Sequence, residues 1–168
     1  MRYISSDTNV WIDFATIGKT EMPFKLPCTF IMSREAIEDE LLSPPGLGEA
    51  LVNYGLIPVE ITIDEFYLAD FYGTVYKKLS AYDRIALAIA KARSMTLLTG
   101  DAALRKAGNL EGVPIMGTLG LMDELWKGRH ISNEEYKDCL QGFLDNNGRA
   151  IRLPSAEIVL RLNRLTCP

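Results

Sequence analysis

The 168-residue chain has only three cysteines, Cys28, Cys139 and Cys167, and a single histidine, His130. The cysteines are odd in number, widely spaced and without a CxxC pair, so neither a disulfide framework nor a zinc site is favoured. No segment approaches the roughly 18 to 20 uncharged apolar residues of a membrane helix, and the N-terminus lacks the pattern of a signal peptide. We therefore expect a soluble cytoplasmic protein with free thiols.

The chain also lacks an excess of basic charge, since 18 lysines and arginines face 22 acidic residues and the net charge is −4. Bulk charge thus gives no reason to expect a polyanionic partner. Two divalent cations held by carboxylates would add about four positive charges and offset this balance. Net charge alone does not decide whether the chain binds nucleic acid.

Hydrophobic residues make up 48% of the chain, which is enough for one well-buried core at this length. Short apolar runs predict five strands, and helical patterns lie between them. The runs occupy residues 2–5, 28–32, 56–61, 95–99 and 113–117. Strands that are apolar on both faces and alternate with helices are typical of a parallel sheet covered on both sides. We predict a three-layer α/β/α sandwich with a central, mostly parallel sheet.

Capping signals predict where several helices begin and end. Ser33 is an expected N-cap for a helix over 33–42, Ser80 for one over 80–94, and Gly108 the expected end of a helix over 100–108. An apolar repeat predicts a helix over 64–79, and two glycines bracket another over 117–128. Beyond Gly128 the strands stop, and Ser132 with Glu135 forms a capping-box pattern. We therefore predict a domain over 1–128 and a C-terminal helical pair over 129–168 that packs on it.

Four acidic residues occupy positions that the predicted fold brings to one edge of the sheet. Asp7 and Asp101 each follow a predicted strand by two residues, and ligands of open parallel sheets bind outside the carboxyl ends of the strands. Glu40 lies about two turns into the helix over 33–42, and Asp83 lies in the first turn of the helix over 80–94. We expect all four carboxylates to converge.

Converging carboxylates repel one another unless cations lie among them, and hard oxygen ligands suit Mg²⁺ or Mn²⁺. Such ions support phosphodiester hydrolysis: one activates the attacking water, and a second, about 3.5 to 4 Å away, stabilises the leaving oxygen. This chemistry needs no histidine, serine or cysteine nucleophile. It is therefore compatible with a chain that has one histidine.

Four segments together resemble the PIN-domain family of metal-dependent nucleases: SSDTNVWIDF, SREAIEDELL, LSAYDRIALAIAKARSMTLLTGDAALRKAG and VPIMGTLGLMDELW. The family includes the ribonuclease toxins of toxin–antitoxin pairs. The resemblance runs in order over about residues 3 to 127, and the tail is similar to that of small prokaryotic PIN proteins described as predicted nucleic-acid binders. It implies a Mg²⁺- or Mn²⁺-dependent endoribonuclease with an RNA substrate and, in the toxin branch, an antitoxin partner.

The resemblance also implies the site residues, placing the catalytic and metal-binding acids on Asp7, Glu40, Asp83 and Asp101. A hydroxyl or amide commonly stands beside the first acid, here Thr8 or Asn9. Glu40 is chosen over its acidic neighbours because it precedes Leu41-Leu42. The segment around Asp101 has no second carboxylate, which leaves open one ion or two. The candidate substrate contacts are Asn9 and three nearby cations, Arg34, Arg84 and Arg105. The arginines could hold substrate phosphates, but surface or salt-bridge roles are their default.

Each of these functional predictions has a purely structural alternative. Asp7, Asp83 and Asp101 could each cap a helix instead of binding a metal. Ser6 and Thr99 could orient the acids or serve only as strand-end hydroxyls. Asp13 and Glu65 are expected on the surface. The helical spacing of one aromatic set predicts mostly core positions: Phe66, Tyr67, Phe71, Tyr72 and Tyr76.

Two other functions compete with the nuclease. A PIN-like fold without catalysis would be a module that binds nucleic acid or a partner protein. A phosphohydrolase of the haloacid-dehalogenase type would need a second Asp two residues after the nucleophile, but Asn9 stands there. The arginine-rich tail, with Arg149, Arg152, Arg161 and Arg164, could meet RNA, an acidic partner or only solvent. A symmetric homodimer is the default form of any self-association.

Overall fold

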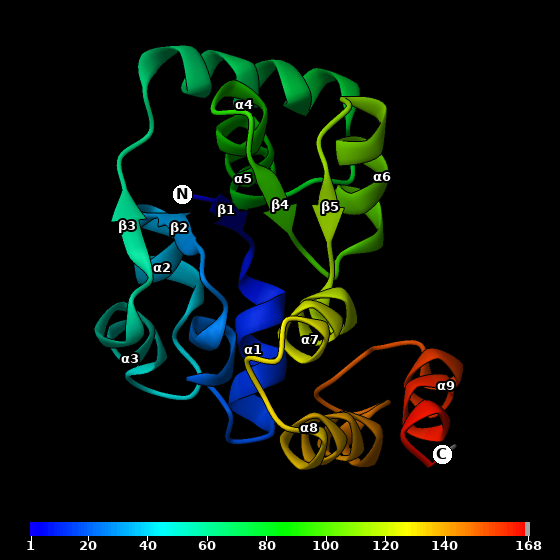
Figure 1. Ribbon diagram of the computed structural model, residues 1–168. Coiled ribbons are helices and arrows are strands. Elements are labelled where there is room, and N and C mark those ends of the chain that lie inside the picture. Colours follow the sequence, from blue (N-terminus) through cyan, green and yellow to red (C-terminus); the bar gives the residue numbers. More distant parts are fainter. Residues whose placement is uncertain (167–168) are drawn as a thin grey trace.

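A computed structural model describes residues 1–166 and contains a five-stranded sheet with helices on both faces (Figure 1). The strands are β1 (Tyr3–Ser6), β2 (Thr29–Ser33), β3 (Ile57–Val59), β4 (Thr96–Leu98) and β5 (Ile115–Met116). All strand pairs are parallel, and the order across the sheet is β3-β2-β1-β4-β5. The predicted strands and the α/β/α fold class are thus confirmed. The chain reverses its direction of progress across the sheet between β1 and β4, where open sheets of this kind bind ligands.

Two groups of helices sandwich the sheet (Figure 1). One face is covered by α1 (Thr8–Thr16), α2 (Arg34–Glu40), α3 (Leu47–Tyr54) and α7 (Thr118–Lys127), and the other by α4 (Ile63–Val75), α5 (Ala81–Ala92) and α6 (Ala102–Leu110). Alternate strand residues face opposite sides, so Leu98 packs in the first layer and Leu97 in the second. A short 3-10 helix, Met22–Lys25, precedes β2.

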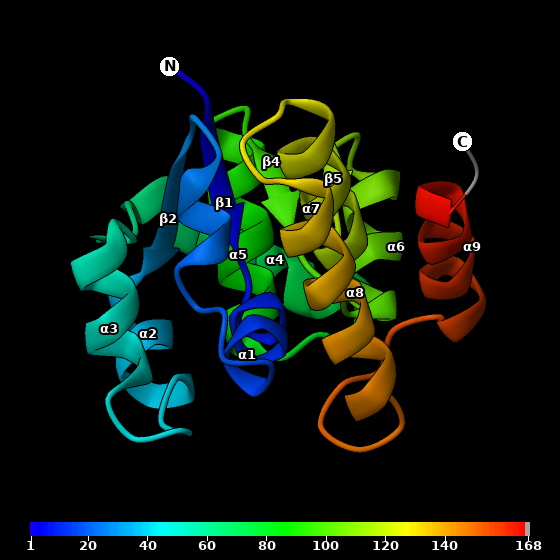
Figure 2. The ribbon, with the colours of Figure 1, turned by 60° about the horizontal axis from the view of Figure 1, so that its bottom comes forward.

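The last two described helices extend the first layer. Figure 2 shows α8 (Asn133–Asn146) beside α7 and α9 (Ser155–Thr166) beyond it. Their fully buried residues, including Cys139, Phe143 and Ile158, belong to the same core as Phe14 of α1, and the Phe14 and Phe143 ring centroids lie 5.5 Å apart. Residues 167 and 168, with Cys167, lie outside the described residues. Cys28 and Cys139 are free thiols, as expected.

Helix ends follow the capping pattern, with one exception. Ser33, Ser80 and Ser132 are N-caps, the last two in full capping boxes. The predicted stop at Gly108 is wrong, because α6 continues to Leu110 and the chain turns at Gly112, where φ is +69°. Gly108 instead allows close packing, since a Cβ there would lie 2.4 Å from Ile115 Cδ1. Helix α3 and the 3-10 helix were not predicted from the sequence.

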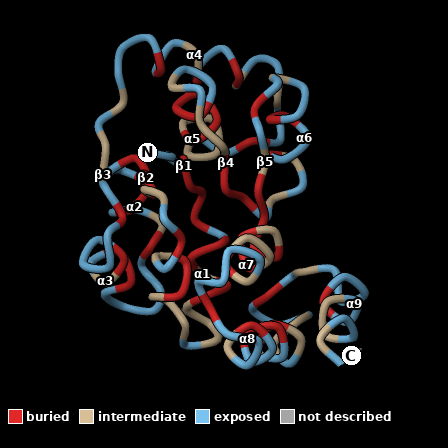
Figure 3. Tube along the Cα trace, viewed as in Figure 1, coloured by how far each residue is buried: buried red, intermediate tan, exposed pale blue. Residues whose placement is uncertain are grey.

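Helix α4 departs most from the prediction (Figure 3). Tyr72 is fully buried, but Phe66, Tyr67 and Phe71 are 58%, 66% and 55% exposed, so most of the aromatic set lies outside the core. The expected surface residue Glu65 is instead 2% exposed and forms an ion pair of 2.6 Å with Arg93. Aromatic residues occur on both sides of this helix, so periodicity does not reveal which side faces the sheet.

No helix among the described residues combines the length and the apolar character needed to cross a membrane.

Candidate active site

Asp7 lies at the carboxyl end of β1, where the backbone leaves the sheet and α1 begins. Its N–H donates to the Leu98 carbonyl of β4 at 2.9 Å, which ties the residue to the neighbouring strand. One carboxylate oxygen, Oδ1, accepts from the Thr8 N–H at 2.7 Å and caps α1. Asp7 is only 4% exposed, so a helix cap accounts for its position but not for the burial of a carboxylate.

Thr99 joins Asp7 to Asp101. The fully buried Thr99 hydroxyl donates to Asp7 Oδ2 at 2.9 Å and accepts from the Asp101 N–H at 3.1 Å. Asp101 follows β4 and caps α6 through the Leu104 N–H, at 2.8 Å from Oδ1. Of the two hydroxyls proposed as orienters, Thr99 contacts an acid. Ser6 instead donates to the Ile31 carbonyl and accepts from the Trp11 indole.

Glu40 approaches Asp7 from α2. The Thr8 hydroxyl donates a short hydrogen bond to Glu40 Oε2, so the residue after Asp7 links β1 to the end of α2. The neighbouring acids are placed otherwise: Glu38 is exposed, and Asp39 accepts from the Tyr82 hydroxyl. The structure therefore turns Glu40, rather than Glu38 or Asp39, toward the residue that follows Asp7.

Asp83 approaches from α5. Its Oδ2 accepts from the Ser80 N–H at 2.8 Å, while the Ser80 hydroxyl accepts from the Asp83 N–H at 3.1 Å. This capping box does not remove Asp83 from the group, because its negative charge acts on Asp7. Asp7, Glu40, Asp83 and Asp101 are called the acid edge below.

Asp7 is the residue of the acid edge whose ionised form is electrostatically unfavourable in the metal-free protein. Burial and then the charge of Asp83 raise the pKa of Asp7 to about 7, with a smaller contribution from Glu40, against the opposing hydrogen bonds from Thr8 and Thr99. No lysine or arginine among the described residues forms an ion pair with any of the four acids. A cation would relieve this repulsion.

The chemistry of the donors fits a hard divalent ion, because all four side chains offer carboxylate oxygens. A small cavity of ≈ 10 Å³ borders Asp7, Glu40 and Tyr82, which suits a water or an ion rather than a substrate. Within residues 1–166 no three His, Cys, Asp or Glu side chains form a ready cage. Asp7, Asp83 and Asp101 are turned instead to the helix ends that they cap, and Glu40 to the Thr8 hydroxyl.

The four predicted substrate contacts divide into two pairs. Asn9 and Asp101 line the same larger cavity. Arg105 lines a second cavity, and Gly100 lines both. Arg34 forms an exposed ion pair of 2.6 Å with Glu60, and Arg84 donates to the Ser80 carbonyl at 3.3 Å. The structure thus places Asn9 on the cavity that contains Asp101 and Arg105 on a cavity that adjoins it, but engages Arg34 and Arg84 elsewhere.

Two features near the site were not expected from the sequence. Asp13 was expected on the surface, but it is 8% exposed and accepts from the Thr118 hydroxyl at 2.7 Å, and burial raises its pKa to about 6. Arg149 and Arg152 border the cavity that contains Asp101. The one sequence signal for Asp13 was its position four residues after Asn9, which puts the two residues on the same face of α1. The placement of the two arginines depends on tertiary contacts.

Comparison with known proteins identifies the family. A family model described as a PIN domain matches residues 3–164, which includes the C-terminal helices. Neither the curated proteins nor the solved structures give a significant match. PIN domains are generally nucleases that use divalent metals and bind nucleic acid. With nearly its whole length matched and its five-stranded parallel sheet in place, the chain belongs to the PIN-domain family.

Proposed function

We propose that this protein is a Mg²⁺- or Mn²⁺-dependent endoribonuclease that hydrolyses RNA phosphodiester bonds at the acid edge. The observation that carries the proposal is Asp7: a 4% exposed carboxylate at the turning point of the sheet, next to other acids and without a cationic partner among the described residues. Unpaired buried carboxylates are costly, and a bound cation offsets that cost.

In this proposal the cations are held by Asp7, Glu40, Asp83 and Asp101, and when bound they activate water and stabilise the departing oxygen. Thr99 fixes the orientation of Asp7 and the start of the segment that carries Asp101. The Thr8 hydroxyl positions Glu40. Residues 1–128 carry this nuclease domain, and residues from 129 onward form its extension.

The test is cleavage of single-stranded RNA by the wild type and by Asp7→Asn and Asp83→Asn. Loss of an outer-shell partner of a metal costs up to roughly 100-fold in activity, so loss of a ligand should cost more. Asp70→Asn removes an equal charge from the exposed side of α4 and should retain full activity. Full cleavage by the Asp7 or Asp83 variant, with no effect of EDTA, would contradict the proposal.

A second candidate is a PIN domain that binds RNA or a protein without cleaving it. It is favoured by the helix-capping bonds that turn Asp83 and Asp101 toward backbone N–H groups. Calorimetric titration with Mn²⁺ separates the two candidates. Binding that is lost in Asp7→Asn supports the nuclease, whereas undetectable binding supports the module.

We also propose that the protein is the toxin of a toxin–antitoxin pair, acts in the cytoplasm on cellular RNA and self-associates as a homodimer. Family membership supports the toxin role. An adjacent gene for a small DNA-binding protein, whose co-expression relieves growth arrest, would support it. Expression without growth arrest would contradict it, and light scattering would measure the oligomeric state.

A further inference from the structure

A groove leads from Asp101, one of the four residues of the acid edge, toward the C-terminal helices. A cavity of ≈ 590 Å³ contains Asn9, Asp101 and Arg149, and it shares Gly100, Arg152 and Leu153 with a second cavity of ≈ 540 Å³. Arg105 also lines the second cavity. The two cavities together are named the arginine groove. They are many times larger than the ≈ 10 Å³ space beside Asp7 and could accommodate part of a polymer.

The arginines of this groove fall into two classes. Arg161 and Arg2 are ion-paired to Asp123 and Glu124, at 2.8 Å and 2.5 Å. Arg105, Arg149 and Arg152 are exposed, and within residues 1–166 none forms an ion pair. Three positive charges on a chain of net charge −4 thus remain available for an external anion, next to the acids of the proposed nuclease.

The loop that carries Arg149 and Arg152 is fixed by its own contacts. The Asn147 side chain donates to the Leu153 carbonyl at 2.7 Å and accepts from the Leu153 N–H at 3.1 Å. Ile151, which lies between the two arginines in the sequence, is fully buried and anchors the loop. Arg149 and Arg152 themselves are exposed. A loop ordered in this way loses little entropy when it binds.

Arg105 is held on the opposite wall. Its guanidinium lies against the backbone of Gly117, where a Cβ would come within 2.4 Å of Arg105 Nη1. Helix α6 therefore supplies one side of the groove, and the loop between α8 and α9 supplies the other. Figure 2 shows α9 across from α6.

We propose that the arginine groove binds the phosphate backbone of a single-stranded RNA and guides it into the acid edge, with Arg105, Arg149 and Arg152 as phosphate contacts. Guanidinium groups bind phosphate oxygens in bidentate fashion and do so without reading the base. A groove with protein on both sides suits one strand better than a duplex. The inference rests on the proposed function for its substrate, and it makes the C-terminal extension part of the substrate-binding surface.

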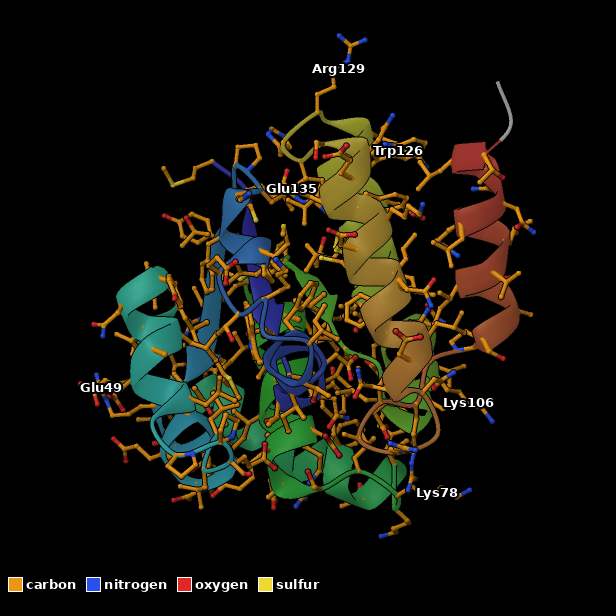
Figure 4. The ribbon with its side chains drawn as sticks, turned by 90° about the horizontal axis from the view of Figure 1, so that it is seen from below. Glu49, Lys78, Lys106, Trp126, Arg129 and Glu135 are labelled. Carbon is orange, nitrogen blue, oxygen red and sulfur yellow. The ribbon has the colours of Figure 1, made fainter. Side chains whose placement is uncertain are left out.

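The test compares Arg149→Gln/Arg152→Gln with the control Lys78→Gln/Arg129→Gln. The control removes the same charge from two exposed side chains, which lie at separate ends of the molecule in Figure 4 and do not line the groove. Binding of a labelled single-stranded RNA of about 16 nucleotides is measured in EDTA, so that cleavage does not interfere. Melting temperatures verify that both variants are folded.

The groove variant should bind on the order of 10-fold more weakly, because it loses two solvent-exposed charge contacts. The slope of log affinity against log salt should become about 1.4 shallower, at about 0.7 per phosphate contact for single strands. Equal weakening in the control, an unchanged slope, tighter binding of duplex RNA, or no RNA binding by the wild type would overturn the inference.

Cleavage in Mn²⁺ is measured separately, which distinguishes the two proposals. A wild type that cleaves while the groove variant binds RNA normally would overturn the groove and leave the nuclease standing. A wild type that never cleaves, together with a groove variant that loses RNA binding and salt dependence, would overturn the nuclease and support the groove.

Discussion

Two regions of this molecule bury a carboxylate, and they shift its pKa in opposite directions. At the contact between α7 and α9, burial of Asp123 is outweighed by hydrogen bonds from Arg161 and Tyr136, and the pKa of Asp123 is lowered. At the acid edge, Asp7 has hydroxyl and backbone donors but no cation, and its pKa is raised to about 7. The first carboxylate is stabilised by its surroundings, and the second is destabilised.

The difference indicates what each region contributes. The Asp123–Arg161 pair attaches α9 to α7, with Arg161 Nε and Nη2 at 2.9 Å and 2.8 Å from the two carboxylate oxygens. Asp7 has no such role, and an asparagine could cap α1 equally well. Natural proteins retain costly groups chiefly at functional sites. The comparison therefore supports a cation-binding role for the acid edge, and four experiments test it.

The largest change in stability is expected for Arg161→Met. This variant leaves Asp123, whose side chain is 16% exposed, without its cation, so the free energy of unfolding should fall by about 3 kcal/mol. Urea denaturation measures it. Arg2→Met is the matched control, because it breaks an exposed ion pair to the same helix and should cost under about 1 kcal/mol. Equal losses would mean that burial does not distinguish the two pairs.

In the metal-free protein, Asp7→Asn should raise the free energy of unfolding, whereas Arg161→Met lowers it. The folded state holds the Asp7 proton up to a pKa of about 7, against an ordinary value of 3.8, so the stability present below pH 4 is lost as pH rises to about 7. Asparagine does not ionise, so the variant should be more stable at pH 8, by at least the roughly 1.4 kcal/mol that corresponds to one pKa unit. Denaturation at pH 8 and pH 4 should show the gain shrinking toward zero. A constant difference would show that ionisation is not its cause.

Adding Mn²⁺ should stabilise the wild type by mass action, since the ion binds only the folded state. At ten times the dissociation constant the gain is about 1.4 kcal/mol, seen as a rise in melting temperature. Asp7→Asn should show less of this rise, and Asp70→Asn should show all of it. An unchanged melting temperature in the wild type would mean that the acids do not share an ion.

The smallest effect is expected for Asp13→Asn. Burial raises the pKa of Asp13 to about 6, so its ionisation lowers stability as pH rises from about 4 to 6, a narrower window than that of Asp7. The variant should gain less stability than Asp7→Asn at pH 8 and none below pH 4, because the pKa shift of Asp13 is smaller. An unchanged response to Mn²⁺ would show that Asp13 stands apart from the acid edge, whereas a reduced response would add it to the site.

Local patterns predicted much of this fold because they report local physics. Apolar runs marked all five strands, and the serine caps were correct because an N-cap depends on residues within one turn. Gly108 misled the prediction, because glycine serves helix ends and also close packing, and only the contact with Ile115 distinguishes the two. The buried side of α4 was missed for a similar reason, since aromatic residues line both sides.

The order of strands and helices could be predicted from the sequence, and with it that Asp7 and Asp101 would follow strands at the same edge of the sheet. That these two strands, β1 and β4, are neighbours is a finding of the structure. The single histidine and the absence of a CxxC pair also made a carboxylate site a better prediction than a zinc site. Only the tertiary structure decided that Glu40 rather than Asp39 reaches Thr8, that Arg161 is neutralised, and that Arg149 and Arg152 border the groove. Those outcomes depend on contacts between residues far apart in the chain, and no local pattern records which distant partner a charged side chain will find.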